Sequence, residues 1–75
     1  MPKATRFSRL TFGRAIRRER EGLGFSQEKF AERANVHRTY ISSIELGKVS
    51  VGIEVANALA SALDMRLSDL IRRAE

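Results

Sequence analysis

Short segments of helical periodicity, separated by residues that start and stop helices, constrain this sequence most. A serine or threonine before a helix offers its side-chain oxygen to the free N–H groups of the first turn. Glycine and asparagine readily adopt the left-handed conformation that ends a helix. The boundary residues are Ser8 or Thr11, Ser26, Ser50 and Ser68 at the starts, and Gly22, Gly24, Asn35 and Gly47 at the ends. Between them apolar residues recur every three or four positions, so the sequence predicts an all-α fold.

These boundaries predict five helices in one compact domain. The first begins after Ser8 or Thr11 and ends at Gly22, and the others span about 27–34, 37–46, 51–63 and 69–74. We expect Leu23, in the turn after the first helix, and Ile53, in the fourth helix, to point inward. Residues 1–8 are predicted to form a basic N-terminal tail. Residues 9–75 are then the folded domain, which is a usual size for a single small domain.

The charge of the chain is unevenly distributed. The 75 residues carry 14 Lys and Arg against 9 Asp and Glu, a net charge of +5. Residues 1–24 hold seven of the bases and two of the acids, whereas residues 25–75 hold seven of each. A local excess of positive charge favours a polyanionic partner, with nucleic acid ahead of an anionic membrane surface. A basic surface without a partner is the alternative that charge alone leaves open.

Other classes of protein are disfavoured by what the sequence lacks. There is no Cys and only one His, which excludes a disulfide framework, a thiol nucleophile and a zinc finger. No pairing of nucleophile and base and no glycine-rich phosphate loop is visible, so we expect neither an enzyme nor a bound cofactor, metal or small-molecule ligand. Apolar runs are too short to span a bilayer, and the N-terminus lacks the apolar stretch of a signal peptide. The expected location is the cytoplasm.

The segment from Ser26 to Lys48 carries the strongest functional signal. Two short helices are joined by a turn of about three residues, and small or apolar side chains are placed to hold the pair together: Phe30, Ala31, Ala34, Val36, Ile41 and Ile44. Ala31 matters most, because a larger side chain there would separate the helices. The outer face of the second helix of the pair has no acid before Glu45. Such a face suits the floor of a DNA major groove, where acceptors dominate.

These residues resemble the lambda-repressor-like helix-turn-helix family, of the Cro/C1 or Xre type. The supporting motifs are Ser26-Gln27-Glu28, Phe30-Ala31, Asn35-Val36, Tyr40-Ile41-Ser42 and Ile44-Glu45-Leu46-Gly47-Lys48. The resemblance covers about residues 9–73, with the helix-turn-helix at about 26–47. The run from His37 to Ser42 is also similar to the controller proteins of restriction–modification systems. Three positions depart from the family pattern, namely Asn35, Leu46 and Asp64.

The resemblance implies a function and a set of contacts. It implies a sequence-specific transcriptional regulator that binds a palindromic double-stranded DNA operator as a homodimer and controls its own and neighbouring genes. An antitoxin, or a phage or mobile-element repressor that also binds a protein, is the alternative. Base reading is expected from the outer face of the third helix: Arg38, Thr39, Tyr40, Ser42 and Ser43. Contacts with the DNA backbone are expected from Gln27, His37, Lys48 and Arg17. For Tyr40, a half-buried position in the core remains open.

Two structural roles follow from the same resemblance. Arg20 and Glu45 occupy positions that form an internal salt bridge in relatives, which would tie the first helix to the end of the third. The predicted dimer interface lies near the C-terminus. The fifth helix is only about two turns long, and it carries more apolar surface than one neighbouring helix needs. The residues expected in this interface are Met65, Leu67, Leu70 and Ile71.

Overall fold

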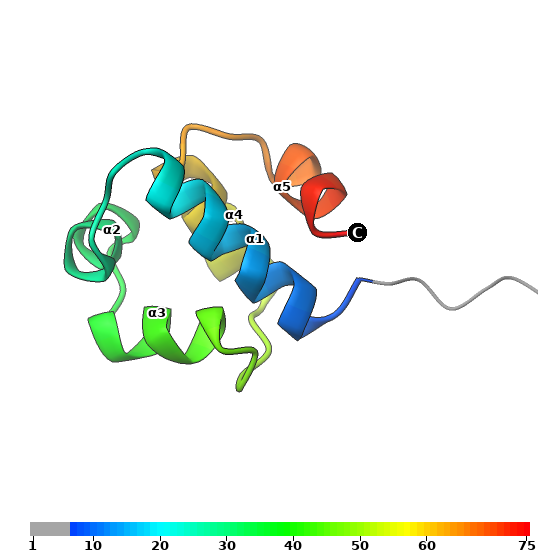
Figure 1. The fold of residues 1–75 in the computed structure, drawn as a ribbon, viewed down its shortest axis with the longest axis horizontal. Coiled ribbons are helices and arrows are strands. Elements are labelled where there is room, and N and C mark those ends of the chain that lie inside the picture. The colour runs from blue at the N-terminus through cyan, green and yellow to red at the C-terminus, as the bar shows by residue number, and fades with distance from the viewer. Residues whose placement is uncertain (1–6) are drawn as a thin grey trace, which may run out of the picture.

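The structure is a computed structural model, and it describes residues 7–75. These residues form five helices and no strand, which confirms the all-α prediction. The helices are α1 (Arg9–Gly22), α2 (Gln27–Ala34), α3 (Arg38–Glu45), α4 (Ile53–Ala62) and α5 (Leu67–Ala74). Figure 1 shows α2 and α3 at one end of the molecule and α5 at the other, with α1 and α4 running between them. Most of the predicted tail, residues 1–6, lies outside the described residues.

The first three helices begin where the sequence predicts. Ser8 caps α1 in a capping box: its side-chain oxygen accepts a hydrogen bond from the backbone N–H of Thr11, and its own backbone N–H donates to the Thr11 hydroxyl. Ser26 accepts a hydrogen bond from the backbone N–H of Lys29 at the start of α2. His37 caps α3 by accepting one from the N–H of Thr39 through Nδ1.

The starts of α4 and α5 differ from the prediction. Gly52, and not Ser50, is the N-cap of α4, and Arg66, and not Ser68, is the N-cap of α5. Neither cap makes a side-chain hydrogen bond. Val49 and Val51 pack against the core from the connection between α3 and α4, so that the chain stays extended for two residues beyond Ser50. At α5 the packing of Leu67 against the core includes that residue in the helix.

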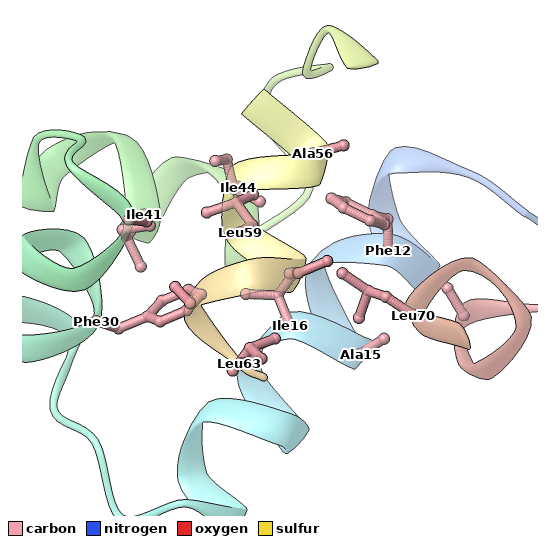
Figure 2. Packing of buried hydrophobic residues seen from close by; sticks show 14 of the residues in the cluster. Phe12, Ala15, Ile16, Phe30, Ile41, Ile44, Ala56, Leu59, Leu63 and Leu70 are labelled. Carbon is pink, nitrogen blue, oxygen red and sulfur yellow. The ribbon is translucent and has the colours of Figure 1, made fainter. Parts of the chain in front are cut away.

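One hydrophobic core joins all five helices. Its fully buried large side chains are Phe30, Ile16, Ile41, Ile44, Leu59 and Leu70. Figure 2 shows Ile16 of α1 and Leu59 of α4 at the centre of this packing, with Phe30 and Ile41 approaching from α2 and α3. Two side chains that were expected to point inward do not. Leu23 is 49% exposed and Ile53 is 76% exposed.

A close contact between α1 and α3 sets the position of α3. Gly13 of α1 is buried against the backbone of Ile44 and Glu45, so the two helices approach without an intervening side chain. The position of α3 is therefore fixed by its close contact with α1.

At the other end of the molecule, α5 is tied to α1 by polar contacts. Arg73 forms an ion pair with Glu19 at 2.8 Å, and the Arg18 side chain donates to the backbone carbonyl of Arg73.

Candidate nucleic-acid interface

The turn between α2 and α3 is built around one left-handed residue. Asn35 has φ 58° and ψ 45°, and its conformation reverses the chain at the end of α2. The backbone N–H of Val36 donates to the carbonyl of Ala31 at 3.0 Å, which closes the turn. Ala31 is only 3% exposed, so the two helices meet across a small side chain. These features form the helix-turn-helix that the sequence predicts.

The residues expected to read bases lie along α3 at different depths. Arg38 and Thr39 are exposed, whereas Ser42 and Ser43 are half-buried one turn further along. Tyr40 is half-buried and packs against the core, which is the alternative that the sequence left open beside base reading. The only acid of α3, Glu45, is buried at 7% exposure. The exposed face of α3 therefore offers a guanidinium and hydroxyl groups without a competing carboxylate.

Arg20, Glu45 and Gln27 form one hydrogen-bonded network beneath this face. Arg20 Nε donates to Glu45 Oε2 at 2.7 Å, and Arg20 Nη2 donates to Glu45 Oε1 at 3.1 Å. The ion pair expected from these two positions is thus present and bidentate, a strong geometry for arginine and carboxylate. Arg20 Nη1 also donates to the backbone carbonyl of Phe25 at 2.7 Å. The network links α1, the turn before α2, and α3.

Gln27 extends the network toward the surface. Its Nε2 donates to Glu45 Oε1 at 3.0 Å, and the side chain is half-buried at the start of α2. One amide proton is used in this bond, which leaves the second N–H of the group and the carbonyl oxygen. The backbone N–H groups of the first helical turn lie at the same end of α2, where they have no carbonyl partner within the helix. Both kinds of donor at this end of α2 suit an anion.

The other residues predicted to contact the DNA backbone differ in whether their side chains already bind another residue. Lys48 is exposed and follows Gly47, and neither Lys48 nor Arg38 forms an ion pair with another residue of the part that the structure describes. Arg17 is exposed but pairs with Glu21 one turn along α1, at 3.1 Å. His37 is exposed, and its Nδ1 is used in capping α3. Among the residues predicted to contact DNA, Arg38 and Lys48 are therefore exposed cations without an ion pair inside residues 7–75.

The predicted dimer interface needs one correction. Leu70 has no exposed surface, because it packs inside the protomer's own core, and it cannot contact a partner. Met65, Leu67 and Ile71 are half-buried and retain surface. The sequence interpretation missed Ile53, which is far more exposed than any of these and lines an apolar groove together with Leu67 and Ile71. Its helical spacing pointed inward, so only its place in the structure reveals it.

Residues 7–75 lack two further kinds of feature. No group of three or more His, Asp or Glu side chains is arranged to hold a metal ion there. None of the five helices is long and apolar enough to cross a membrane.

Comparison with known proteins identifies the class of this fold and site. The family model described as "Helix-turn-helix" matches residues 16–70, and the chain belongs to this family of DNA-binding transcription regulators. It is 39% identical over 64 residues to control protein C.BamHI of Bacillus amyloliquefaciens, covering 84% of this chain and 79% of the relative. It is 36% identical over 63 residues to control protein C.MunI of a Mycoplasma species, covering 83% and 85%.

A solved structure agrees with these relatives. The restriction-modification controller protein C.AhdI from Aeromonas hydrophila superimposes with a TM-score of 0.80 at 32% identity, over 83% of this chain and 94% of that one. The expected resemblance to Cro/C1-type regulators, and within them to controller proteins, is thereby confirmed.

Proposed function

We propose that this protein is a cytoplasmic restriction–modification controller that binds a palindromic operator as a homodimer. The observation that carries the proposal is the acid-free outer face of α3, on which Arg38 is exposed and unpaired among the described residues. In the major groove, the guanidinium can donate two bonds to guanine O6 and N7, and Thr39 can offer its methyl group to thymine. The similarity to control proteins favours this function over an antitoxin.

In this proposal, the backbone contacts surround α3. Gln27 and the first turn of α2 bind one phosphate, and Lys48 binds another beyond the C-terminal end of α3. Arg17 would leave its ion pair with Glu21 to bind a phosphate. Because that pair is exposed, separating it costs little free energy. His37 retains its free Nε2 for the same purpose. These contacts orient α3 without reading sequence.

A single helix-turn-helix reads too few base pairs for selective binding, so the proposal requires two copies. Two-fold symmetry would place the α3 helices about 34 Å apart, on one side of the duplex. The surface for this contact consists of Met65, Leu67 and Ile71, which were predicted, together with the exposed Ile53, which was not. Leu70 supports the surface from inside the protomer.

The test is selection of bound sequences from random duplexes, followed by affinity measurements at increasing salt. We expect a two-fold symmetric consensus whose half-sites are about one helical turn apart. We also expect affinity to fall by orders of magnitude between about 50 mM and 200 mM salt, because several phosphates are neutralised. Selection without any consensus would contradict sequence-specific binding, and a consensus lacking symmetry would contradict the homodimer.

A further inference from the structure

An apolar groove of about 260 Å³ opens where the start of α1, the connection between α3 and α4, and α5 meet. Its walls include Phe7, Phe12, Val51, Ile53, Leu67 and Ile71. None of the described residues that line the groove is one of those proposed to contact DNA. The groove is thus a surface that the proposed operator contacts leave unused.

Ile53 is the side chain that most needs a cover. It stands at the first position of α4 and is 76% exposed, the largest exposure among the large apolar residues of the described chain. An isolated exposed isoleucine is ordinary, but Ile53 lines a groove whose other walls are also mostly apolar. A second copy of the chain would supply both an isoleucine for each groove and a groove for each isoleucine.

Two unpaired charges stand beside this surface. Among the described residues that line the groove, Arg9 is the only charged one, and it forms no ion pair with another residue of the range 7–75. Glu54 follows Ile53 directly, is exposed, and likewise has no ion pair within that range. Each protomer therefore presents a cation, Arg9, in its own groove. It also presents an anion, Glu54, next to the isoleucine that could fill the groove of a second copy.

We propose that two copies of the chain dock groove to groove, with Ile53 of each protomer in the partner's groove and Glu54 paired with the partner subunit's Arg9. A two-fold interface is self-complementary, so each contact occurs twice. In this docking, Glu54 follows the inserted isoleucine at the mouth of the partner's groove, where its side chain extends toward the arginine in the wall. The proposal rests on the homodimer of the proposed function, and adds the pair that selects an identical partner.

Charge reversal tests the pairing in the absence of DNA, with the dimer dissociation constant measured by sedimentation at about 50 mM salt. Arg9→Glu and Glu54→Arg should each weaken the dimer about tenfold, because each places like charges together at two symmetric sites. The double variant should return to within about threefold of the parent protein. Arg14→Glu is the matched control, since Arg14 is an exposed arginine of α1 that has no ion pair within residues 7–75 and does not line the groove. It should leave dimerisation nearly unchanged.

Mixing the two single variants separates pairing between protomers from pairing within one. A mixed dimer of Arg9→Glu and Glu54→Arg chains has opposite charges at both sites, so the mixture should dimerise about as well as the parent protein. Ile53→Ser should weaken the dimer more than tenfold, while circular dichroism shows an unchanged helix content, because the side chain is mostly outside the core.

Specific outcomes would overturn the proposal. A mixture no better than either single variant would do so, as would an Arg14→Glu effect equal to that of Arg9→Glu. A symmetric operator selected by a protein whose charge reversals leave the dimer intact would reject this docking and keep the proposed function. Absence of any sequence-selective DNA binding, with the charge-swap pattern intact, would reject the proposed function and keep the docking.

Discussion

Gly13 of α1 lies directly against the carbonyl oxygen of Ile44 in α3. A β-carbon built on Gly13 would overlap that oxygen and come within 3.1 Å of the Glu45 backbone. Backbone atoms on both sides leave no flexible side chain that could move away. Thus α3 can lie this close to α1 only because residue 13 has no side chain.

Gly13→Ala is therefore expected to destabilise the protein by roughly 3 kcal/mol, at the upper end of the usual cost of overpacking. Gly22→Ala is the matched control, because Gly22 is also in α1 and a β-carbon there would meet nothing within 4 Å. That change should be neutral or stabilise by up to about 1 kcal/mol, since alanine favours the helix. Urea unfolding of both variants measures the difference. Equal stabilities would contradict the close approach of α1 and α3.

The buried pair of Arg20 and Glu45 gives a second prediction. Arg20→Met or Glu45→Leu alone should destabilise by about 3–5 kcal/mol, because each leaves a buried charge without its partner. The double variant should be more stable than either single variant, since no buried charge remains. Chemical denaturation of the four proteins completes the double-mutant cycle. A double variant as unstable as the sum of the singles would show that the two side chains do not interact.

Local signals in the sequence were sufficient for the helix-turn-helix. Ser26 and Asn35 act through bonds and backbone conformations within a few residues, and the structure has them where they were predicted. His37 caps α3 in the same local way, although it was predicted as a contact with the DNA backbone and not as a cap. The starts of α4 and α5 were wrong by about two residues. Serine at position 50 or 68 is a good local cap, but contacts of Val51 and Leu67 with the distant core decide where each helix begins.

The candidate site shows the same division. The exposed Arg38 and the pairing of Arg20 with Glu45 could be expected from residue type and family pattern. The bond between Gln27 and Glu45, the burial of Leu70 and the exposure of Ile53 could not. Each depends on how the helices pack against one another, which no periodicity within a single helix specifies.

Asp64 allows a test of backbone conformation. It follows α4 with φ 56°, a left-handed value that costs an ordinary residue about 1 kcal/mol relative to glycine. Asp64→Gly should therefore stabilise by up to about 1 kcal/mol, even though it removes a weak 3.9 Å pair with Arg33. Asp64→Ala removes the same carboxylate but keeps the β-carbon, and should be less stable than Asp64→Gly by about 1 kcal/mol. Thermal unfolding that ranks alanine above glycine would contradict this account.

Arg38 and Lys48 should affect DNA binding in different ways. Arg38→Ala should weaken binding to the selected operator by about 1–3 kcal/mol per half-site, and relax preference at one base pair of each. Lys48→Ala should weaken binding to all duplexes about equally, and reduce the slope of log affinity against log salt by about one per protomer. Both side chains are exposed and unpaired within residues 7–75, so neither change should unfold the protein.

The measurement is fluorescence anisotropy against a panel of operators, each carrying one substituted base pair. Arg72→Ala is the control, because Arg72 is an exposed base on α5 that pairs with Asp69, at the far end of the molecule from α3 in Figure 1. It should change neither affinity nor preference appreciably. Arg38→Ala and Lys48→Ala have different expected signatures because a base edge differs between sequences and a phosphate does not. Identical profiles for the two variants across the panel would mean that α3 does not read the bases through Arg38.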